Sequence, residues 1–316
     1  MGIFDKRVEY KPFEYPEVLQ FIEMVNSSFW VHSEVDFTAD IQDFHTQLTP
    51  IEQSAVKNAL LAIAQIEVSV KTFWGNLYNH LPKPEFNGLG STFAECEWRH
   101  SEAYSRLLTV LGYEDEFKQF VNIPLIEERI KMFGEYLNTD DITSKMFYFT
   151  IIVENVSLFT QFATILSFTR FRGLMKNVSN MIAWTSVDEQ VHANAGIWIL
   201  NQIRRENPEL TTLDQTFAAE LTAIIEKEDE LVDFIFEAGE LSNFTKQDMK
   251  NFMRYRVDKS MEALKMPAVF HITHDQYKPM AWFEEEVFAG SSDDFFAKRP
   301  TDYTKHDKSI TAKDLF

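Results

Sequence analysis

The sequence predicts an all-α protein built from long helices, and three observations support this fold class. Gly and Pro number only 10 each in 316 residues, which is few for a β-rich or loop-rich chain. Long stretches repeat apolar residues at the spacing of a helix, and no long stretch alternates in the manner of a strand. Hydrophobic residues make up 45% of the chain and include 29 Phe, so a large and bulky core can form.

Capping residues and prolines place the helix boundaries. The first 48 residues are expected to be mostly irregular, with short helical pieces over 15–29. The segment "LTPIEQ" then supplies Thr49 as N-cap, Pro50 at the first helical position and Glu52 to close a capping box. The helices expected after this start, each ended by Gly, Pro or a polar turn, cover 49–81, 90–112, 114–137, about 139–175, 178–207, 211–238 and 246–264.

We expect one helical domain over 1–283 and a flexible tail over 284–316. From about residue 284 the sequence has mixed charge and no helical period, and it ends in an apolar tip, Leu315–Phe316. Segments of this kind contribute little to a packed core.

Charge and cysteine content exclude several classes of protein. The chain has 49 acidic against 30 basic residues, a net charge of −19, which argues against a nucleic-acid partner. Cys96 is the single cysteine, so no internal disulfide can form, and we interpret it as a small buried side chain in a reducing compartment. The apolar stretch 155–169 is too short to span a bilayer, and no signal peptide is evident. We therefore expect a cytoplasmic protein that is not bound to a membrane.

A short pattern occurs twice along the sequence: one Glu on a helix, followed by Glu-x-x-His on the next helix. Chance alone predicts about one Glu-x-x-His or Asp-x-x-His pair in this composition, so the motif by itself carries little weight. Both copies nevertheless use Glu and lie inside predicted helices. The six residues are Glu67, Glu97 and His100 in the first half, and Glu154, Glu189 and His192 in the second.

Glu154 is the most informative of these residues. It lies in "FYFTIIVENVSLFTQF", and no Lys or Arg occurs between Lys145 and Arg170 to pair with it locally. A buried, unpaired carboxylate there would cost several kcal/mol, so either a metal ion compensates it or the residue is partly exposed or bridged to a distant cation. Single Glu residues on two helices and Glu-x-x-His on two others form the pattern of ferritin-like dinuclear carboxylate proteins.

The sequence therefore predicts a ferritin-like helical bundle with a dinuclear metal site in its core. Four carboxylates and two imidazoles suit iron or manganese better than zinc. His271 and His274 have no carboxylate near them in the sequence and are not expected to be ligands.

The motifs "ECEWRHSEAY" and "VDEQVH" resemble those of the small, radical-generating subunit of class I ribonucleotide reductase. In that family a Tyr lies four residues after the first His, here Tyr104, and an Asp precedes the second Glu, here Asp188. The family also has a Trp in an upstream Phe-Trp pair, and "SSFWVHSEVD" supplies Trp30. Its C-terminal tail carries a Tyr, here Tyr303, and a tip that docks on the large subunit, here "KDLF". The likeness covers about 20–316.

The resemblance implies an oxidoreductase subunit with two metal ions per chain. An oxygen species would oxidise the metal pair, and His100, Asp188, Trp30 and Tyr303 would relay the oxidising equivalent. The large catalytic subunit would use it to reduce ribonucleotides to deoxyribonucleotides. A homodimer is implied as well. The interval between Glu154 and Glu189 is one residue longer than expected for the family, which a π-bulge would absorb.

Lys71 bears on the choice of metal. It lies one helical turn after Glu67 and either points outward or places an ammonium near the metals, where it would attract an anionic oxidant such as superoxide. The class Id subgroup of the family uses a dimanganese site directly as the oxidant. We therefore favour manganese, with iron or a mixed Mn/Fe pair as alternatives, and Tyr104 either stores the radical or only packs in the core.

Two other functions remain open at this point. A ferritin-like oxidase or desaturase would need an apolar substrate channel at the metals. A metal storage protein would need neither Trp30 nor a tail carrying a Tyr.

Overall fold

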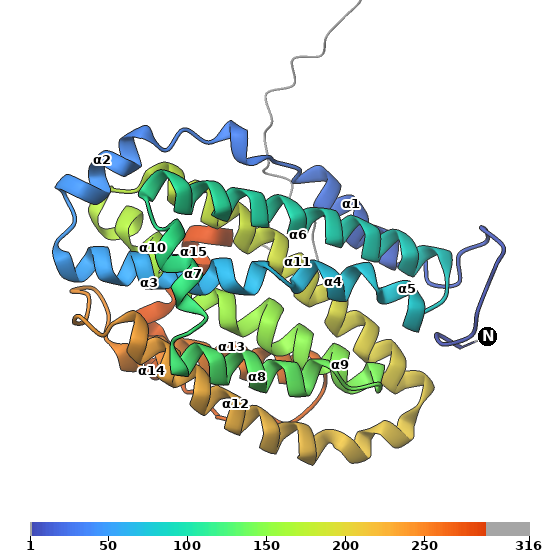
Figure 1. Cartoon of the computed structure of the whole chain (residues 1–316). Coiled ribbons are helices and arrows are strands. Elements are labelled where there is room, and N and C mark those ends of the chain that lie inside the picture. Colours follow the sequence, from blue (N-terminus) through green and yellow to red (C-terminus); the bar gives the residue numbers. More distant parts are fainter. Residues whose placement is uncertain (1, 289–316) are drawn as a thin grey trace, which may run out of the picture.

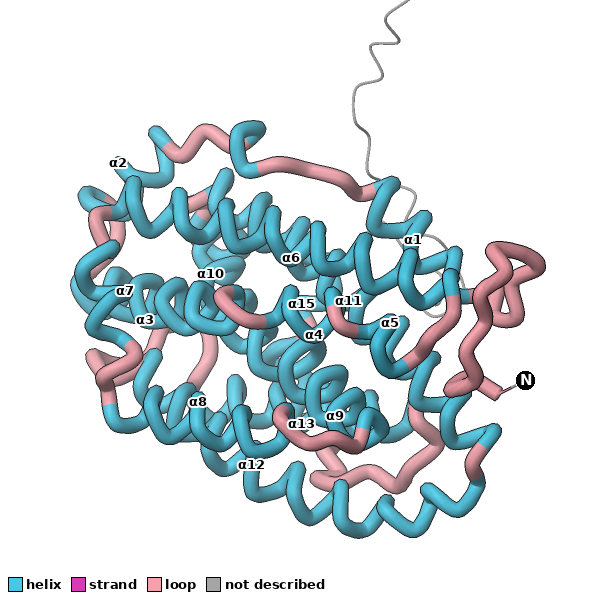
Figure 2. Tube along the Cα trace, turned by 45° about the vertical axis from the view of Figure 1, so that its right-hand side comes forward, coloured by secondary structure: helices cyan, strands magenta, loops and turns pink. Residues whose placement is uncertain are grey.

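The computed structural model describes residues 2–288, and within them it contains helices and loops but no strand (Figures 1 and 2). The all-α prediction is therefore confirmed. The α-helices in the first half are α1 (Val18–Ser27), α2 (Thr38–Thr46), α3 (Pro50–Glu67), α4 (Val70–Gly75), α5 (Leu77–His80), α6 (Pro84–Leu111), α7 (Glu114–Phe120) and α8 (Pro124–Leu137). Those in the second half are α9 (Ile142–Tyr148), α10 (Leu158–Arg172), α11 (Lys176–Glu206), α12 (Asp214–Ile235), α13 (Lys246–Ala263), α14 (His274–Tyr277) and α15 (Trp282–Phe288). The shorter helical segments are η1 (His32–Glu34), η2 (Phe149–Ser157), η3 (Pro208–Leu213) and η4 (Lys278–Met280).

Three predicted helices differ in the structure, and one of them, expected over 114–137, is divided into α7 and α8. Helix α3 begins at the predicted capping box, in which the Glu52 carboxylate accepts a hydrogen bond of 2.8 Å from the Thr49 backbone N–H. The expected helix over 49–81 is, however, interrupted after Glu67 and continues as α4 and α5. Helix α6 begins at Pro84 and not at 90, because a proline that stops one helix can also occupy the first position of the next.

Segments α9, η2 and α10 form one continuous helix, Ile142–Arg172, through the middle of the protein. Its central part, η2, is a π-helix, and Glu154 lies within it. The predicted π-bulge is therefore present at Glu154. By length and composition this helix could cross a membrane, but the apolar window that meets this criterion is completely buried inside the fold.

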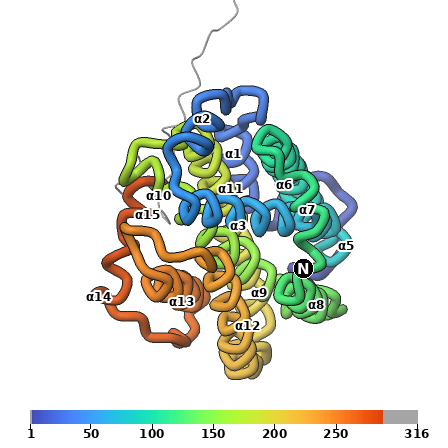
Figure 3. Tube along the Cα trace, turned by 60° about the vertical axis from the view of Figure 1, so that its left-hand side comes forward, coloured from blue at the N-terminus to red at the C-terminus, as the bar shows by residue number. Residues whose placement is uncertain are grey.

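The other helices surround this central element. Helix α11 contacts α10 and η2, and α6 contacts α3, α4 and α1. Helices α1 and α2 lie on one side of the molecule, whereas α12, α13 and α14 lie on the opposite side (Figures 1 and 3). Helix α13 packs against both α12 and η2, so the second side of the molecule directly supports the π-helix.

The predicted irregular segments contain more helix than expected. Helix α2 lies within the first 48 residues, and α15 extends past residue 284, where the tail was expected to start. Trp282 and Phe283 are buried, and the Phe283 ring lies 5.8 Å from that of Phe159, centroid to centroid. Burial of these aromatic rings therefore stabilises a helix at the start of a segment in which a run of acidic residues gave no helical period in the sequence.

Helix α11 approaches η2 closely at Gly196. A Cβ atom added there would overlap the side chain of Thr150, which is fully buried in the π-helix. Glycine is needed at this crossing because it has no side chain, so the backbone of α11 can lie against the segment that carries Glu154.

We expect Gly196→Ala to destabilise the protein by about 1–3 kcal/mol, because the added methyl group overpacks the crossing of α11 and η2. Gly134→Ala is the matched control. Its added Cβ would meet only Asn138 Nδ2 at 3.5 Å, so removing a helical glycine should stabilise α8 by about 0.5–1 kcal/mol. Chemical denaturation of both variants measures the difference, and equal effects of the two substitutions would contradict the close contact.

Candidate metal centre

The six residues singled out in the sequence meet in the centre of the bundle. Glu67 is the last residue of α3, Glu97 and His100 lie in α6, Glu154 in η2, and Glu189 and His192 in α11. All six are at most 1% exposed. Their ligand atoms form two groups, within each of which the atoms lie no more than 4.8 Å apart; the groups are Glu67, Glu97, His100 and Glu189, and Glu97, Glu154, Glu189 and His192. Glu97 and Glu189 thus belong to both groups.

Each shared carboxylate faces both imidazoles. His100 Nδ1 lies 3.0 Å from Glu189 Oε1 and 3.4 Å from Glu97 Oε2. His192 Nδ1 lies 2.9 Å from Glu97 Oε1 and 3.1 Å from Glu189 Oε2. The two nitrogen atoms and the two shared carboxylates therefore surround a common space, with Glu67 on one side and Glu154 on the other.

Many of these atoms have no hydrogen-bond partner. Among the described residues, both oxygens of Glu67, both oxygens of Glu97, Glu154 Oε2, Glu189 Oε1 and His100 Nδ1 are buried without one. Leaving a buried polar group unsatisfied costs about 1–3 kcal/mol, and more if it is charged. Oxygen and imidazole nitrogen lone pairs that converge in this way fit hard or borderline divalent cations.

Burial and mutual repulsion shift the proton affinities of the carboxylates. The pKa of Glu67 is raised well above its usual value by burial and by its neighbours Glu97 and Glu189. Burial and the same two neighbours raise the pKa of Glu154. Burial would also raise the pKa of Glu189, but the close contacts with His100 and His192 hold it below the usual value.

The imidazoles respond in the opposite sense to burial. Burial alone would lower the pKa of His192, but the charge of Glu97 and contacts with Glu154 and Glu189 raise it well above the usual value. The pKa of His100 is raised as well, against the effect of burial, by Cys96, Asp188 and Glu189. Without metal, the site therefore retains protons that a bound cation would displace.

The outer side of His100 is held by a chain of hydrogen bonds. Asp188 Oδ2 lies 3.3 Å from His100 Nε2 and accepts a 2.9 Å hydrogen bond from Trp30 Nε1. The indole of Trp30 also stacks on the imidazole, with ring centroids 5.6 Å apart. The structure thus brings Trp30, Asp188 and His100 together, as the resemblance implies.

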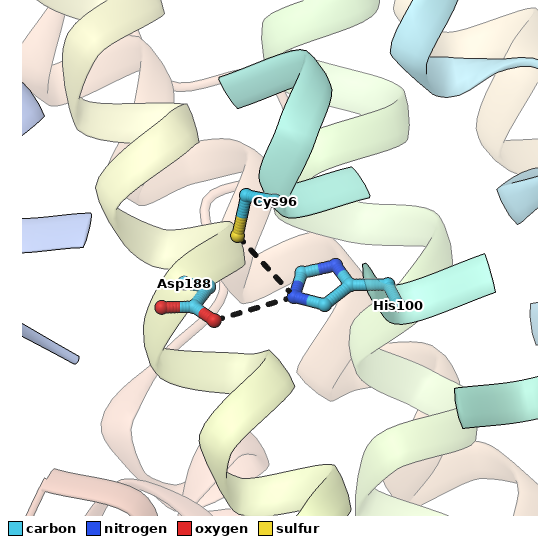
Figure 4. A group of neighbouring side chains, drawn as sticks. All are labelled: Cys96, His100 and Asp188. Atoms are coloured by element: carbon cyan, nitrogen blue, oxygen red, sulfur yellow. Dashed lines mark hydrogen bonds and ion pairs between the residues drawn. The ribbon is translucent and has the colours of Figure 1, made fainter. Parts of the chain in front are cut away.

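Ser28 and Cys96 also contact the residues on the Nε2 side of His100, and the sequence analysis assigned neither of them to this region. Ser28 Oγ donates a 2.8 Å hydrogen bond to the second oxygen of Asp188. Cys96 is buried as expected, but its Sγ lies 3.5 Å from His100 Nε2, the same nitrogen that faces Asp188 (Figure 4). Ser28 follows the end of α1 and is 160 residues from Asp188 in the sequence, so no local pattern indicates the contact.

Trp74 is a further residue that the sequence analysis missed. Its indole N–H donates a 2.7 Å hydrogen bond to Glu154 Oε1, and it is completely buried. Two signals pointed to it: Trp74 follows a Phe, as Trp30 does, and it lies seven residues after Glu67, on the same helical stripe.

Tyr104 is 1% exposed in α6, one turn beyond His100. Among the described residues its hydroxyl has no partner at hydrogen-bonding distance and angle. Its pKa is raised well above the usual value by burial and by the charge of Glu67. The ring therefore lies within the electrostatic reach of the carboxylate cluster.

Lys71 does not contact the carboxylates. Its ammonium donates to the backbone oxygens of Glu67 and Val68, at 3.1 Å each, and to Ser101 Oγ at 3.2 Å. The helix break after Glu67 turns the lysine toward the end of α3, where it caps carbonyl groups. Of the two alternatives for Lys71, an ammonium against the carboxylates is therefore not found, and Lys71 gives no support for an anionic oxidant.

The other predicted residues are outside the cluster. His271 and His274 are exposed, and neither belongs to a group of candidate ligands within the described residues. Tyr303 and the tip "KDLF" lie outside the described residues.

Comparison with known proteins decides which family has this architecture. Residues 7–279 match the model of the family described as ribonucleotide reductase, small chain. The protein belongs to this family. Its members are small subunits that work with a large catalytic subunit and hold a dinuclear metal site, and the two ligand groups found here agree with that architecture.

Relatives and solved structures are similar over nearly their whole length. A probable ribonucleoside-diphosphate reductase small subunit of Invertebrate iridescent virus 3 is 25% identical, and the match covers 95% of this chain and 85% of the relative. A ribonucleoside-diphosphate reductase small subunit of Plasmodium falciparum is 24% identical, with 96% and 92% covered.

The solved structures establish the likeness of the fold. The dimanganese(II)-NrdF of Streptococcus sanguinis superposes with a TM-score of 0.78 at 17% identity, covering 89% of this chain and 99% of that chain. The ribonucleotide reductase R2 subunit of Clostridium botulinum gives the same TM-score at 16% identity, with 88% and 90% covered. The ferritin-like bundle predicted for the small subunit is thus confirmed.

We expect the metal-free protein to lose stability as the pH rises above about 6.5. Glu67, Glu154, His100 and His192 all bind their protons more tightly in the folded state, because their pKa values are raised. The folded state then holds more protons than the unfolded state, so the free energy of unfolding falls as the pH rises through these values.

Thermal unfolding of chelator-treated protein across this pH range measures the effect. Glu154→Gln should weaken the pH dependence, since an amide cannot lose the proton that Glu154 loses. Excess Mn²⁺ should reverse the trend, because metal binding requires the deprotonated groups. A metal-free protein that becomes more stable from neutral to alkaline pH would contradict the shifts.

Proposed function

We propose that the six clustered side chains would hold two metal ions, one in each group, and that Glu97 and Glu189, which belong to both groups, would contribute to both sites. The observation that carries the proposal is that two groups share two carboxylates and that most of the ligand atoms in these groups have no hydrogen-bond partner. Four carboxylates and two imidazoles suit manganese or iron. Manganese is the first candidate, because the similar Streptococcus sanguinis protein is a dimanganese form; iron and a mixed pair are the alternatives.

When bound, the metal pair supplies a one-electron oxidant for the radical chemistry of the reductase. The residues of the protein form the path to it. Asp188 accepts hydrogen bonds from Trp30 and Ser28 and lies against His100 Nε2, so the imidazole, carboxylate and indole are in continuous contact. Asp188 can hold the indole proton as an electron leaves the Trp30 ring, which makes these two residues the inner part of the proposed relay.

The partner in this proposal is the large catalytic subunit, which the C-terminal tail would contact. Tyr303 would continue the relay from Trp30, and the tip "KDLF" would dock on the large subunit. A homodimer of the small subunit is part of the same proposal.

A lipid oxidase or desaturase is less well supported. The structure has a cavity of about 540 Å³, lined largely by apolar side chains of α4, α5, α8 and η2, as a substrate channel would be. None of the six clustered residues lines it. The rings of Phe73 and Phe149, which do line it, stack at 3.7 Å and contact Trp74, the residue bonded to Glu154. An apolar substrate in this cavity would therefore not contact the carboxylates.

Glu154→Ala tests the metal assignment. We expect the variant to keep its helical circular dichroism, because the apolar faces of the helices supply most of the stability. It should bind fewer than two metal ions per chain, since the second group loses one of its four ligand residues. Elemental analysis after loading with Mn²⁺ or Fe²⁺ gives the stoichiometry, and two tightly held ions per chain in the variant would exclude Glu154 as a ligand.

Tyr104→Phe tests where the oxidising equivalent resides. If a manganese pair is itself the oxidant, the variant should retain substantial turnover with the large subunit, because the ring and its packing are preserved. We expect this outcome. Electron paramagnetic resonance of the activated protein provides the second measurement, and Tyr148→Phe serves as a control at a buried tyrosine outside the cluster. A sharp tyrosyl signal that disappears together with activity in Tyr104→Phe would show that Tyr104 stores the radical.

Deleting residues 300–316 tests the proposed partner. We expect the truncated protein to load metal as the full-length protein does, since the six clustered residues remain, but to lose both large-subunit binding and nucleotide reduction. Sedimentation of the mixed subunits and a turnover assay measure the two effects. Continued nucleotide reduction by the truncated protein would rule out the relay through Tyr303.

A further inference from the structure

A buried arginine lies behind the carboxylate cluster. Arg256, in α13, is only 5% exposed, and its hydrogen bonds to described residues all go to amide oxygens. Its Cζ lies 3.4 Å from the centroid of the Phe159 ring. Burying a guanidinium is unfavourable unless its donors are satisfied, so these contacts require an explanation.

One set of contacts reaches the π-helix immediately after Glu154. Arg256 Nε donates a 2.6 Å hydrogen bond to the backbone oxygen of Asn155, and its Nη2 donates to the Asn155 side-chain oxygen. In return, the Asn155 side-chain amide donates to the backbone oxygen of Arg256, at 3.3 Å, and to Ser260 Oγ. Asn155 is thereby held to α13 through its backbone and both ends of its side chain.

The backbone contact matters because of the π-helical register. An α-helix pairs each carbonyl with the N–H four residues on, and a π-helix pairs it with the N–H five residues on. Where η2 returns to α-helix, the backbone has one carbonyl acceptor more than it has N–H donors. One carbonyl there is therefore left without a partner of its own in the helix. Arg256 Nε supplies an external donor to the Asn155 carbonyl, which lies near that end of η2.

A second contact reaches α11 immediately after Glu189. Arg256 Nη2 donates a 2.9 Å hydrogen bond to Gln190 Oε1. One guanidinium therefore joins the two residues that follow Glu154 and Glu189, and it does so from a helix that contributes no residue to the cluster. Although burial lowers the pKa of Arg256 to about 10, the group stays protonated at neutral pH and keeps all its donors.

We propose that Arg256 is a positioning residue for the metal centre: it holds the π-helical register of η2 and thereby keeps Glu154 directed at the site. A shift of η2 by one residue into the α-helical register would turn the Glu154 side chain by about 100°. Such a rotation would remove Glu154 from the group that it forms with Glu97, Glu189 and His192. This inference rests on the metal-ligand set proposed above.

The test is a Mn²⁺ titration of the metal-free, full-length protein, followed by electron paramagnetic resonance of free and bound manganese. Arg256→Met removes every donor but keeps much of the apolar volume. We expect the first ion to bind as in the unmodified protein and the second to bind about 10–100-fold more weakly, as with other losses of residues that orient ligands. The signal of a coupled manganese pair should be replaced by that of an isolated ion, and amides of 149–157 should exchange faster with solvent.

Three further variants separate positioning from general stability. Arg256→Lys retains one donor group for the Asn155 carbonyl and should restore part of the second-ion affinity. Gln190→Leu removes only the α11 contact, leaves α13 intact and should weaken the second ion less than Arg256→Met does. Arg129→Met removes another buried arginine, which pairs with Glu228 and has no contact with the six clustered residues, and should lower the melting temperature without changing either manganese affinity.

The outcomes are distinguishable. Unmodified protein that binds fewer than two ions would refute the proposed function itself. Unmodified protein that binds two, together with unchanged second-ion affinity and unchanged exchange over 149–157 in Arg256→Met, would overturn the role of Arg256 alone. An equal loss of the second ion in Arg129→Met would also overturn it, because the effect would then be general destabilisation.

Discussion

Four carboxylates and two imidazoles share one completely buried space, and the rest of this structure is arranged around that constraint. Like charges at this separation cannot all ionise in a protein interior without compensation, and the penalty is several kcal/mol per ion. Among the described residues, no lysine or arginine contacts the carboxylate or imidazole groups of the cluster. Bound cations are the natural compensation, and the apolar packing of the surrounding helices provides the stability that keeps the ligand atoms together.

The surroundings of the two imidazoles are unequal. His100 Nε2 faces Asp188 and Cys96, and through Asp188 it is joined to Trp30. His192 Nε2 has no hydrogen-bond partner among the described residues. Of the two imidazoles, only that of His100 therefore begins a hydrogen-bonded route away from the cluster, and this is the side on which the proposed relay starts.

The two central helices of the second half depend on contacts that lie far from them in the sequence. Glu154 is held by Trp74 of α4 on one side, while its neighbour Asn155 is held by Arg256 of α13 on the other. Gly196 allows α11 to lie against the same segment. A π-helix is an unfavourable local structure. Here it is stabilised by tertiary contacts at each side, and it directs Glu154 toward the site.

Local rules were sufficient for the helical class, the capping box at Thr49 and all six clustered residues. The reason is that a spacing of three residues on a helix places Glu and His on one face whatever the tertiary structure, and an isolated Glu in an apolar helix must be compensated. The roles of Trp74, Ser28 and Arg256, and the direction of Lys71, were decided only by tertiary structure. The contacts of each of these residues depend on where its helix ends or on which distant helix packs against it. The break after Glu67 turns Lys71 away from the carboxylates. The packing of α13 on η2 brings Arg256 to Asn155. The spacing of residues in the sequence determines their geometry within one helix, but it does not determine the geometry between two helices.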